Sequence, residues 1–120
     1  EDVLKRGSPD IVLVNSPQDA HQDHEALAGC VVTACRYVPR VFFYHDYTTL
    51  NFEPDTFVDI GSVLERKKNL LACHRSQVRM KYPTGLDMLE SVGSLAGYYG
   101  FMAKVRYAEA FKPLRNLLTV

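Results

Sequence analysis

Two imidazoles and three carboxylates lie within residues 19–25, whose sequence is Asp-Ala-His-Gln-Asp-His-Glu. His21 and His24 are three positions apart, so a helix that begins near Ala20 would place both rings on one face. One imidazole suits Zn²⁺, the second can act as an acid, and the Asp23 carboxylate can hold a ring N–H and fix its tautomer. The spacing predicts that both rings reach a common point, where a metal ion and acid–base chemistry would meet.

The same H-x-x-H pair also arises by chance and can do no more than cap a helix. A second hypothesis is therefore a non-catalytic α/β binding module. The loop from His45 to Asp55 would then serve as a surface for a ligand or partner, because Tyr44, Tyr47 and Phe52 can stack on a sugar without a metal. Metal content would separate these two hypotheses.

Strand and helix patterns on either side of the segment predict how it is positioned. Residues 11–14 are a short apolar run bounded by turn residues, which is typical of a strand buried on both faces. Apolar residues recur at helical spacing over 27–38, Pro39 ends that helix, and 41–44 form a second strand. A strand, a helix and a strand in this order predict an α/β fold with a mostly parallel sheet.

The remainder of the chain predicts further short elements. Residues 57–60 are an extended piece, and Ser62 and Glu65 stand at capping-box spacing before a helix that runs to about residue 74. Residues 86–103 predict another helix, in which the three glycines favour close helix packing over a phosphate loop. Residues 105–111 predict a last extended segment.

Composition excludes several classes of protein. The 14 basic and 14 acidic residues cancel and are mixed along the chain, so no nucleic-acid partner is expected. No apolar run approaches the roughly 20 residues of a membrane span, which predicts a cytoplasmic location. The three cysteines form no C-x-x-C pair, and Cys30 and Cys35 are expected to be buried thiols.

Several short motifs, in order from about residue 9 to residue 111, resemble those of the LmbE-like (PIG-L) family of zinc-dependent N-deacetylases. The segment His21 to His24 resembles that family's H-x-D-H motif at the start of a helix. The others resemble its F-x-P, V-D-I, K-x-x-A-L, H-x-S-Q and A-E-x-F motifs: Phe52-Glu53-Pro54, Val58-Asp59-Ile60, Lys67 or Lys68, His74-Arg75-Ser76-Gln77, and Ala108-Glu109-Ala110-Phe111.

The resemblance implies a Rossmann-like, three-layer α/β fold and hydrolysis of an acetyl amide on an N-acetylglucosamine-type amino sugar. It implies that His24 is a Zn²⁺ ligand, that His21 polarises the carbonyl or protonates the leaving amine, and that Asp23 tunes the pair. His45 and His74 are expected to be structural or to support the site from outside it. Which amino-sugar derivative is used stays open among a disaccharide, a nucleotide sugar, a thiol conjugate and an antibiotic precursor.

One family motif, H-P-D-D-E, has no counterpart in these 120 residues. The resemblance implies that this motif supplies two further zinc ligands and the aspartate base, so residues 1–120 are expected to be the C-terminal portion of a single domain. By themselves they would be inactive, because one imidazole does not hold zinc. The missing N-terminal half or a complementing chain would complete the site. A third hypothesis is a deacetylase remnant that pairs with another chain or forms a homo-oligomer.

Overall fold

The computed structural model describes residues 2–78, 80 and 82–118 and has a mixed α/β architecture. Its strands form one four-stranded sheet in the order β1-β2-β4-β3. β1 and β2 are parallel, whereas β2 and β4 are antiparallel, so the sheet is mixed rather than mostly parallel. The predicted α/β class is confirmed. The elements in chain order are α1 (Asp2–Gly7), β1 (Ile11–Asn15), α2 (Gln22–Ala34), β2 (Arg40–Tyr44), β3 (Thr56–Asp59), α3 (Leu64–Ala72), α4 (Arg75–Val78), α5 (Met88–Ala103) and β4 (Ala108–Asn116).

The chain divides into two compact units. Glu1–Thr56 and Ala110–Val120 form the first, here called the sheet unit, and Phe57–Glu109 form the second, here called the helical unit. The assignment of residues 1–120 to a single domain stays a prediction. Over the described residues, neither unit has a helix with the length and apolar character needed to cross a lipid bilayer.

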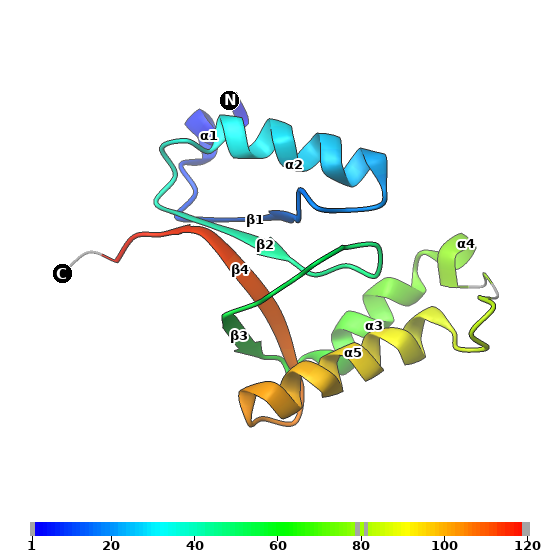
Figure 1. Cartoon of the computed structure of the whole chain (residues 1–120). Coiled ribbons are helices and arrows are strands. Elements are labelled where there is room, and N and C mark those ends of the chain that lie inside the picture. The colour runs from blue at the N-terminus through cyan, green and yellow to red at the C-terminus, as the bar shows by residue number, and fades with distance from the viewer. Residues whose placement is uncertain (1, 79, 81, 119–120) are drawn as a thin grey trace. The chain divides into compact units, whose positions relative to one another are not determined.

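The core of the sheet unit lies between α2 and the parallel strands. Figure 1 shows α2 along one face of β1, and Val14, Ala28 and Cys35 are among the buried residues of this cluster. The C-terminal end of α2 is held by Arg115 of β4, whose guanidinium donates hydrogen bonds to the carbonyl oxygens of Cys35 (3.1 Å) and Val38 (2.7 Å). These bonds satisfy carbonyl groups that the end of a helix leaves without partners.

One face of β1 is buried and the other is covered only at the last residue, Asn15, which corrects the prediction of a strand covered on both faces. Val14 is 3% exposed and packs in the core, whereas Ile11 is 50% and Leu13 54% exposed. Successive side chains of a strand alternate between its two faces, so Ile11, Leu13 and Asn15 share one face, which is exposed except at Asn15. The apolar pattern correctly indicated a strand. The described residues, however, cover only one of its two faces along its length.

The helical unit packs α3 against α5 around Ile60, Leu64 and Ala96. The predicted capping box at Ser62 and Glu65 is wrong, because α3 begins after Val63 without a side-chain cap. A capping box is present instead at the start of α5. There the Asp87 carboxylate accepts from the Glu90 N–H (2.8 Å), and the Glu90 carboxylate accepts from the Asp87 N–H (3.0 Å).

Of the three glycines of α5, only Gly93 faces a residue of another helix, Lys68 of α3, whereas Gly100 faces the turn that follows α5. A Cβ atom on Gly100 would come within 2.6 Å of the Arg106 carbonyl oxygen, and one on Gly93 within 3.3 Å of the Lys68 side chain. Gly97 has no such neighbour within 4 Å. All three lie inside a regular helix, so the structure gives them no phosphate-loop geometry.

β4 extends the predicted terminal segment to Asn116 and includes a proline. Pro113 faces Phe42 where the register with β2 shifts between Val41 and Phe42. Because proline has no N–H to donate, strands tolerate it at such irregularities.

All three cysteines are free thiols. Cys35 is buried as predicted, but Cys30 lies on the exposed side of α2 and Cys73 is exposed in the helical unit. The prediction of a buried Cys30 is therefore wrong.

Candidate functional site

The predicted segment follows β1 and is joined to the loop that follows β2. The Ala20 N–H donates to the Thr48 carbonyl oxygen (2.9 Å), and the Leu50 N–H donates to the Gln18 carbonyl oxygen (2.8 Å). Asp19 and Thr49 form an isolated β-bridge between the same two loops. Both loops leave the carboxyl ends of parallel strands, which is where open α/β sheets place their ligands.

Buried polar residues collect at this end of β1. Among the described residues, the buried polar or charged ones are Asn15, Ser16 and Asp19. The Asp19 carboxylate accepts hydrogen bonds from the His21 N–H (2.8 Å) and from the Thr49 hydroxyl (3.3 Å). A carboxylate taken out of water needs such partners, so the two loops are built around this side chain.

The environment of Asp19 favours its ionised form. Burial acts to raise the pKa of this carboxyl, but the Thr48 hydroxyl, the His21 N–H and the His24 ring together outweigh burial and lower the pKa below its ordinary value of 3.8. Asp19 is therefore a fixed negative charge at neutral pH.

His24 directs its Nδ1 atom at oxygen acceptors. Nδ1 lies 3.3 Å from Asp19 Oδ2, 3.9 Å from Asp46 Oδ2 and 3.4 Å from the Thr48 hydroxyl. An ionised carboxylate only accepts, so Nδ1 carries a proton and, in the neutral ring, Nε2 keeps its lone pair. Nε2 makes no hydrogen bond to any residue that the structure describes. The ring thus presents the form of imidazole that binds a metal.

His21 is fixed in the opposite tautomer. It is the N-cap of α2, which begins at Gln22, and its Nδ1 accepts a hydrogen bond from the Asp23 N–H (3.2 Å). A backbone N–H only donates, so Nδ1 is unprotonated and, in the neutral ring, Nε2 carries the proton. His21 therefore presents an N–H donor beside the lone pair of His24.

The two rings are stacked, with centroids 4.5 Å apart and planes inclined by 17°. A metal ion lies close to the plane of an imidazole that binds it, so two stacked and nearly parallel rings cannot both bind one ion in this arrangement. The two rings lie side by side, and the assignment of one to a metal and the other to acid–base chemistry stays a prediction. One ring can bind a metal, and the other can donate a hydrogen bond to a group held beside it.

The carboxylate that orients His24 is Asp19, not Asp23. Asp23 contributes its backbone N–H to His21, and its own carboxylate contacts neither ring among the described residues. Sequence reasoning included Asp19 in the segment but gave it no role. A signal was present, since Asp19 is the first charged residue after β1 and lies where a buried strand meets its site.

His24 fits the role of a single zinc ligand but not a complete centre. No group of three or more His, Cys, Asp or Glu side chains that could hold a metal ion occurs among residues 2–78, 80 and 82–118. The Nδ1 contact with Asp19 is the usual support of a zinc-binding imidazole. The donor set of the described chain can therefore hold zinc only as part of a shared site.

The remaining predicted residues lie near the site or apart from it. His45 follows β2 and stacks on Phe52, with ring centroids 4.9 Å apart. Burial lowers the pKa of His45 against the opposing charges of Asp46 and Asp19. His74 lies in the helical unit, between α3 and α4. Lys67 forms an ion pair with Glu109 in the same unit, which joins two of the motifs that suggested the family resemblance.

Of the comparisons with known proteins, only the comparison of structures finds similar proteins. No protein-family model matches the sequence, and a search of curated proteins gives no match. The conserved protein TT1542 from Thermus thermophilus has a similar structure, with a TM-score of 0.79 and 27% identity over 98% of this chain. GalB, the 4-carboxy-2-hydroxymuconate hydratase from Pseudomonas putida, is similar with a TM-score of 0.83 and 23% identity over 99% of this chain.

These similarities define the chain as an α/β protein whose fold also occurs in an enzyme, the hydratase. The chain spans 57% of the length of each of the two solved structures. Neither description mentions a deacetylase or a metal, so the family suggested by the motifs stays a resemblance.

Proposed function

We propose that these residues form part of a zinc-dependent N-deacetylase that hydrolyses the acetyl amide of an N-acetylglucosamine-type amino sugar. The observation that carries the proposal is the pair of opposite tautomers: His24 presents a lone pair and His21 an N–H, side by side, at the carboxyl ends of parallel strands. A ligand for a Lewis acid and a donor for a developing oxyanion are two requirements of amide hydrolysis.

His24 would hold the zinc ion together with ligands from polypeptide outside residues 1–120. When bound, zinc would supply Lewis acidity and activate water near neutral pH. Asp19 keeps the His24 lone pair available, because its carboxylate accepts the Nδ1 proton. Asp46 and Thr48 support the same orientation from the loop after β2.

Of the two roles suggested for His21, its contacts favour polarising the carbonyl over protonating the amine. A ring that gives a proton away from Nε2 must first carry protons on both nitrogens, and a proton on Nδ1 would break the bond that the Asp23 N–H donates. The neutral ring keeps that bond and donates from Nε2 to the carbonyl oxygen as negative charge develops there. Another group would then protonate the leaving amine.

Zinc content of the polypeptide expressed from the complete native coding sequence tests the proposal. We expect one zinc ion per chain and release of acetate from N-acetylglucosamine derivatives. We expect His24→Ala to weaken zinc binding on the order of 100-fold or more, because a ligand is lost. Glu25→Gln, on an exposed neighbour in the first turn of α2, is the control and should bind zinc normally. Zinc binding that survives His24→Ala would end the proposal.

A hydratase is the second candidate, favoured by the structural similarity to GalB. Addition of water to a carbon–carbon double bond that is conjugated to a carbonyl group also uses activated water and a donor for a developing oxyanion, so the same two imidazoles could serve it. An assay with unsaturated hydroxy acids, run beside the acetate assay, separates the two chemistries. Sugar binding without zinc or turnover would instead favour the non-catalytic module.

A further inference from the structure

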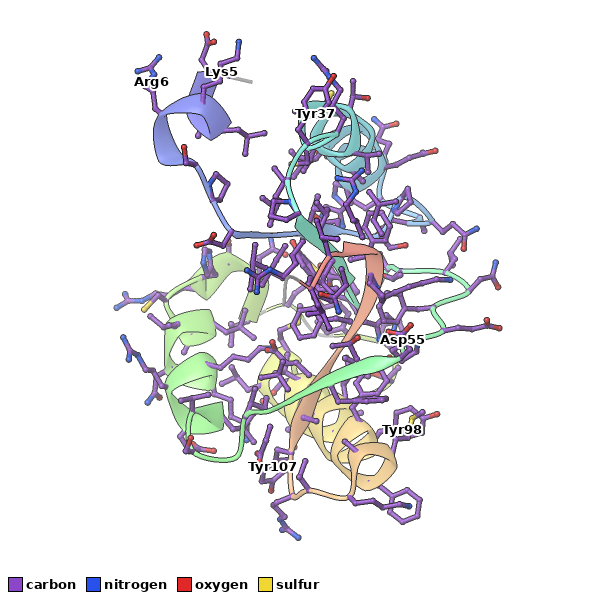
Figure 2. The ribbon with its side chains drawn as sticks, turned by 90° about the vertical axis from the view of Figure 1, so that its left-hand side faces the viewer. Lys5, Arg6, Tyr37, Asp55, Tyr98 and Tyr107 are labelled. Atoms are coloured by element: carbon purple, nitrogen blue, oxygen red, sulfur yellow. The ribbon has the colours of Figure 1, made fainter. Side chains whose placement is uncertain are left out.

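One side of α5 carries large side chains that nothing in the helical unit covers. Tyr98 is 60% and Phe101 77% exposed, and Met102 and Val105 are exposed as well. Residues three and four positions apart lie on one side of a helix, so these four form a contiguous apolar stripe. Figure 2 shows the Tyr98 side chain projecting outward from α5. Single exposed apolar residues are ordinary, but a contiguous stripe indicates an interaction surface.

The first half of the same side carries small residues, because Ser91 and Ser94 precede Tyr98 at the same steps of three and four. Each serine hydroxyl donates to a carbonyl oxygen of the preceding turn, Ser91 to that of Asp87 (2.8 Å) and Ser94 to that of Glu90 (2.9 Å). Since both hydroxyls already have partners within the helix, another side chain can cover them without leaving a donor unsatisfied. The two serines and the four large residues are here called the α5 face.

Opposite charges lie beside the two ends of the α5 face. Glu90 is exposed in the first turn of α5. Lys104 is the C-cap of the helix, and its Nζ atom lies 5.1 Å from the centre of the Phe101 ring. Roughly four helical turns separate Glu90 from Lys104, so both lie on the same flank of the face. The face is therefore small and acidic at its beginning, and large and basic at its end.

We propose that the α5 face packs against the same face of a second copy of this chain, with the two helices antiparallel. A two-fold axis that crosses the face between Ser94 and Tyr98 brings Tyr98 of each copy to Ser94 of the other. The same axis brings Phe101 of each copy to Ser91 of the other. Large side chains of one helix then occupy the spaces beside small ones of its neighbour, which is how closely packed helix pairs interlock.

The charges select the same arrangement. In an antiparallel pair related by a two-fold axis, the same flanks of the two helices meet. Glu90 of each copy therefore lies beside Lys104 of the other, whereas a parallel pair would place like charges together. The α5 face thus matches its own reverse in both size and charge. A partner of uniform shape or of a single charge would match only half of it.

Sedimentation of the polypeptide expressed from the complete native coding sequence tests the inference. We expect a dimer that dissociates on dilution. Phe101→Asp should weaken the dimer about 100-fold or more, because it removes a large apolar contact and buries a charge at two symmetric positions. Tyr37→Asp is the control: it replaces another exposed aromatic residue, 87% exposed in the sheet unit, and should leave the dimer unchanged.

A mixture of two charge variants tests the antiparallel direction. Glu90→Lys alone and Lys104→Glu alone each place like charges together across the two-fold axis, so each should weaken its own dimer about 10-fold. When the two variants are mixed, opposite charges face each other again at both positions. The mixture should therefore form heterodimers with about the affinity of the unmodified protein, which native mass spectrometry measures.

A monomer at every concentration would overturn the inference. If Phe101→Asp then lowered the Tm of that monomer, polypeptide outside residues 1–120 would cover the α5 face instead. An assembly that persists in Phe101→Asp would place the interface elsewhere, and a random proportion of heterodimers in the mixture would exclude the antiparallel pair. The masses of the unmodified protein and of Phe101→Asp decide the question even if Glu90→Lys, which loses its capping bond, fails to fold.

None of these measurements depends on zinc or on turnover. A dimer through α5 in a protein that binds no zinc would remove the proposed function and leave this interface. Zinc bound through His24 in a monomer would do the reverse.

Discussion

The sheet unit and the helical unit use polar residues in different ways. In the sheet unit, Asn15, Ser16 and Asp19 are buried at one end of β1, and the imidazoles of His21 and His24 adjoin them. In the helical unit, the buried residues among those described are apolar or aromatic, and its one described link between distant charged side chains, Lys67 to Glu109, is partly exposed. Burying polar groups is costly, and such groups are retained where they hold other groups in position. We therefore expect chemistry in the sheet unit and packing alone in the helical unit.

The sharpest way to break this comparison is to remove the His21 donor without removing the cap of α2. His21→Ser keeps an oxygen that can accept from the helix N-terminus but loses the ring N–H. We expect kcat to fall about 100- to 1000-fold, as when one oxyanion donor is removed, with zinc affinity unchanged. Steady-state kinetics and zinc titration would show this. If His21→Ser keeps full activity, the ring serves only as a cap.

Asp19→Asn should act on the metal rather than on the substrate. The amide has the size of the carboxylate, but its NH₂ group can donate to His24 Nδ1 and reverse the tautomer of the ring. We expect zinc affinity to fall about 10- to 100-fold, the usual cost of losing a carboxylate that supports a ligand. Competition with a chelator measures this. Asp23→Asn is the control and should bind zinc normally.

Changes in the helical unit should alter stability and leave the site intact. Gly100→Ala would force a Cβ atom to 2.6 Å from a backbone oxygen, and we expect the free energy of unfolding to fall by about 1–3 kcal/mol. Gly97→Ala meets no neighbour within 4 Å and should raise it by about 0.5–1 kcal/mol, because alanine favours the helix. Urea denaturation measures both. Loss of zinc binding in either variant would contradict the division of roles.

The smallest effect concerns His45, which has a lowered pKa. Because the folded protein holds its proton less tightly than the unfolded chain, the stability that neutral His45 contributes is present above the unfolded value of 6.5 and is lost as pH falls below it. His45→Phe keeps the stacking on Phe52 and removes the proton. The free energy of unfolding should then depend less steeply on pH between about 6.5 and 5, by at most about 1.4 kcal/mol per pH unit. An unchanged slope would contradict the assignment.

Local patterns predicted the elements well, and contacts between distant residues account for what they missed. The apolar runs of β1 and β2 and the long helix α5 lie within a few residues of their predicted bounds. The segment from Asp19 to Glu25 was identified because its residue types are unusual at such a spacing. The arrangement of its side chains was not predicted. Asp19 rather than Asp23 contacts the His24 ring, and this depends on Thr48 and Thr49 in a loop that follows a different strand.

The antiparallel pairing of β4 is a second long-range feature, because its register is set against β2 from the far end of the chain. Spacing alone also misplaced a cap. Ser62 and Glu65 have the correct separation, but the chain enters the helix one residue later, and the same motif operates at Asp87 and Glu90. Periodicity also did not predict that one face of β1 and Cys30 are exposed. Whether an apolar side chain is buried depends on which other elements pack against it, and the local pattern does not specify that.

The cysteines give each unit its own reporter position. Cys30 is accessible in the sheet unit and Cys73 in the helical unit, while Cys35 is shielded from reagents by burial. A maleimide donor and acceptor dye can therefore be attached to the native sequence without engineering. Energy transfer between them would follow any movement of one unit against the other while zinc and amino sugars are added.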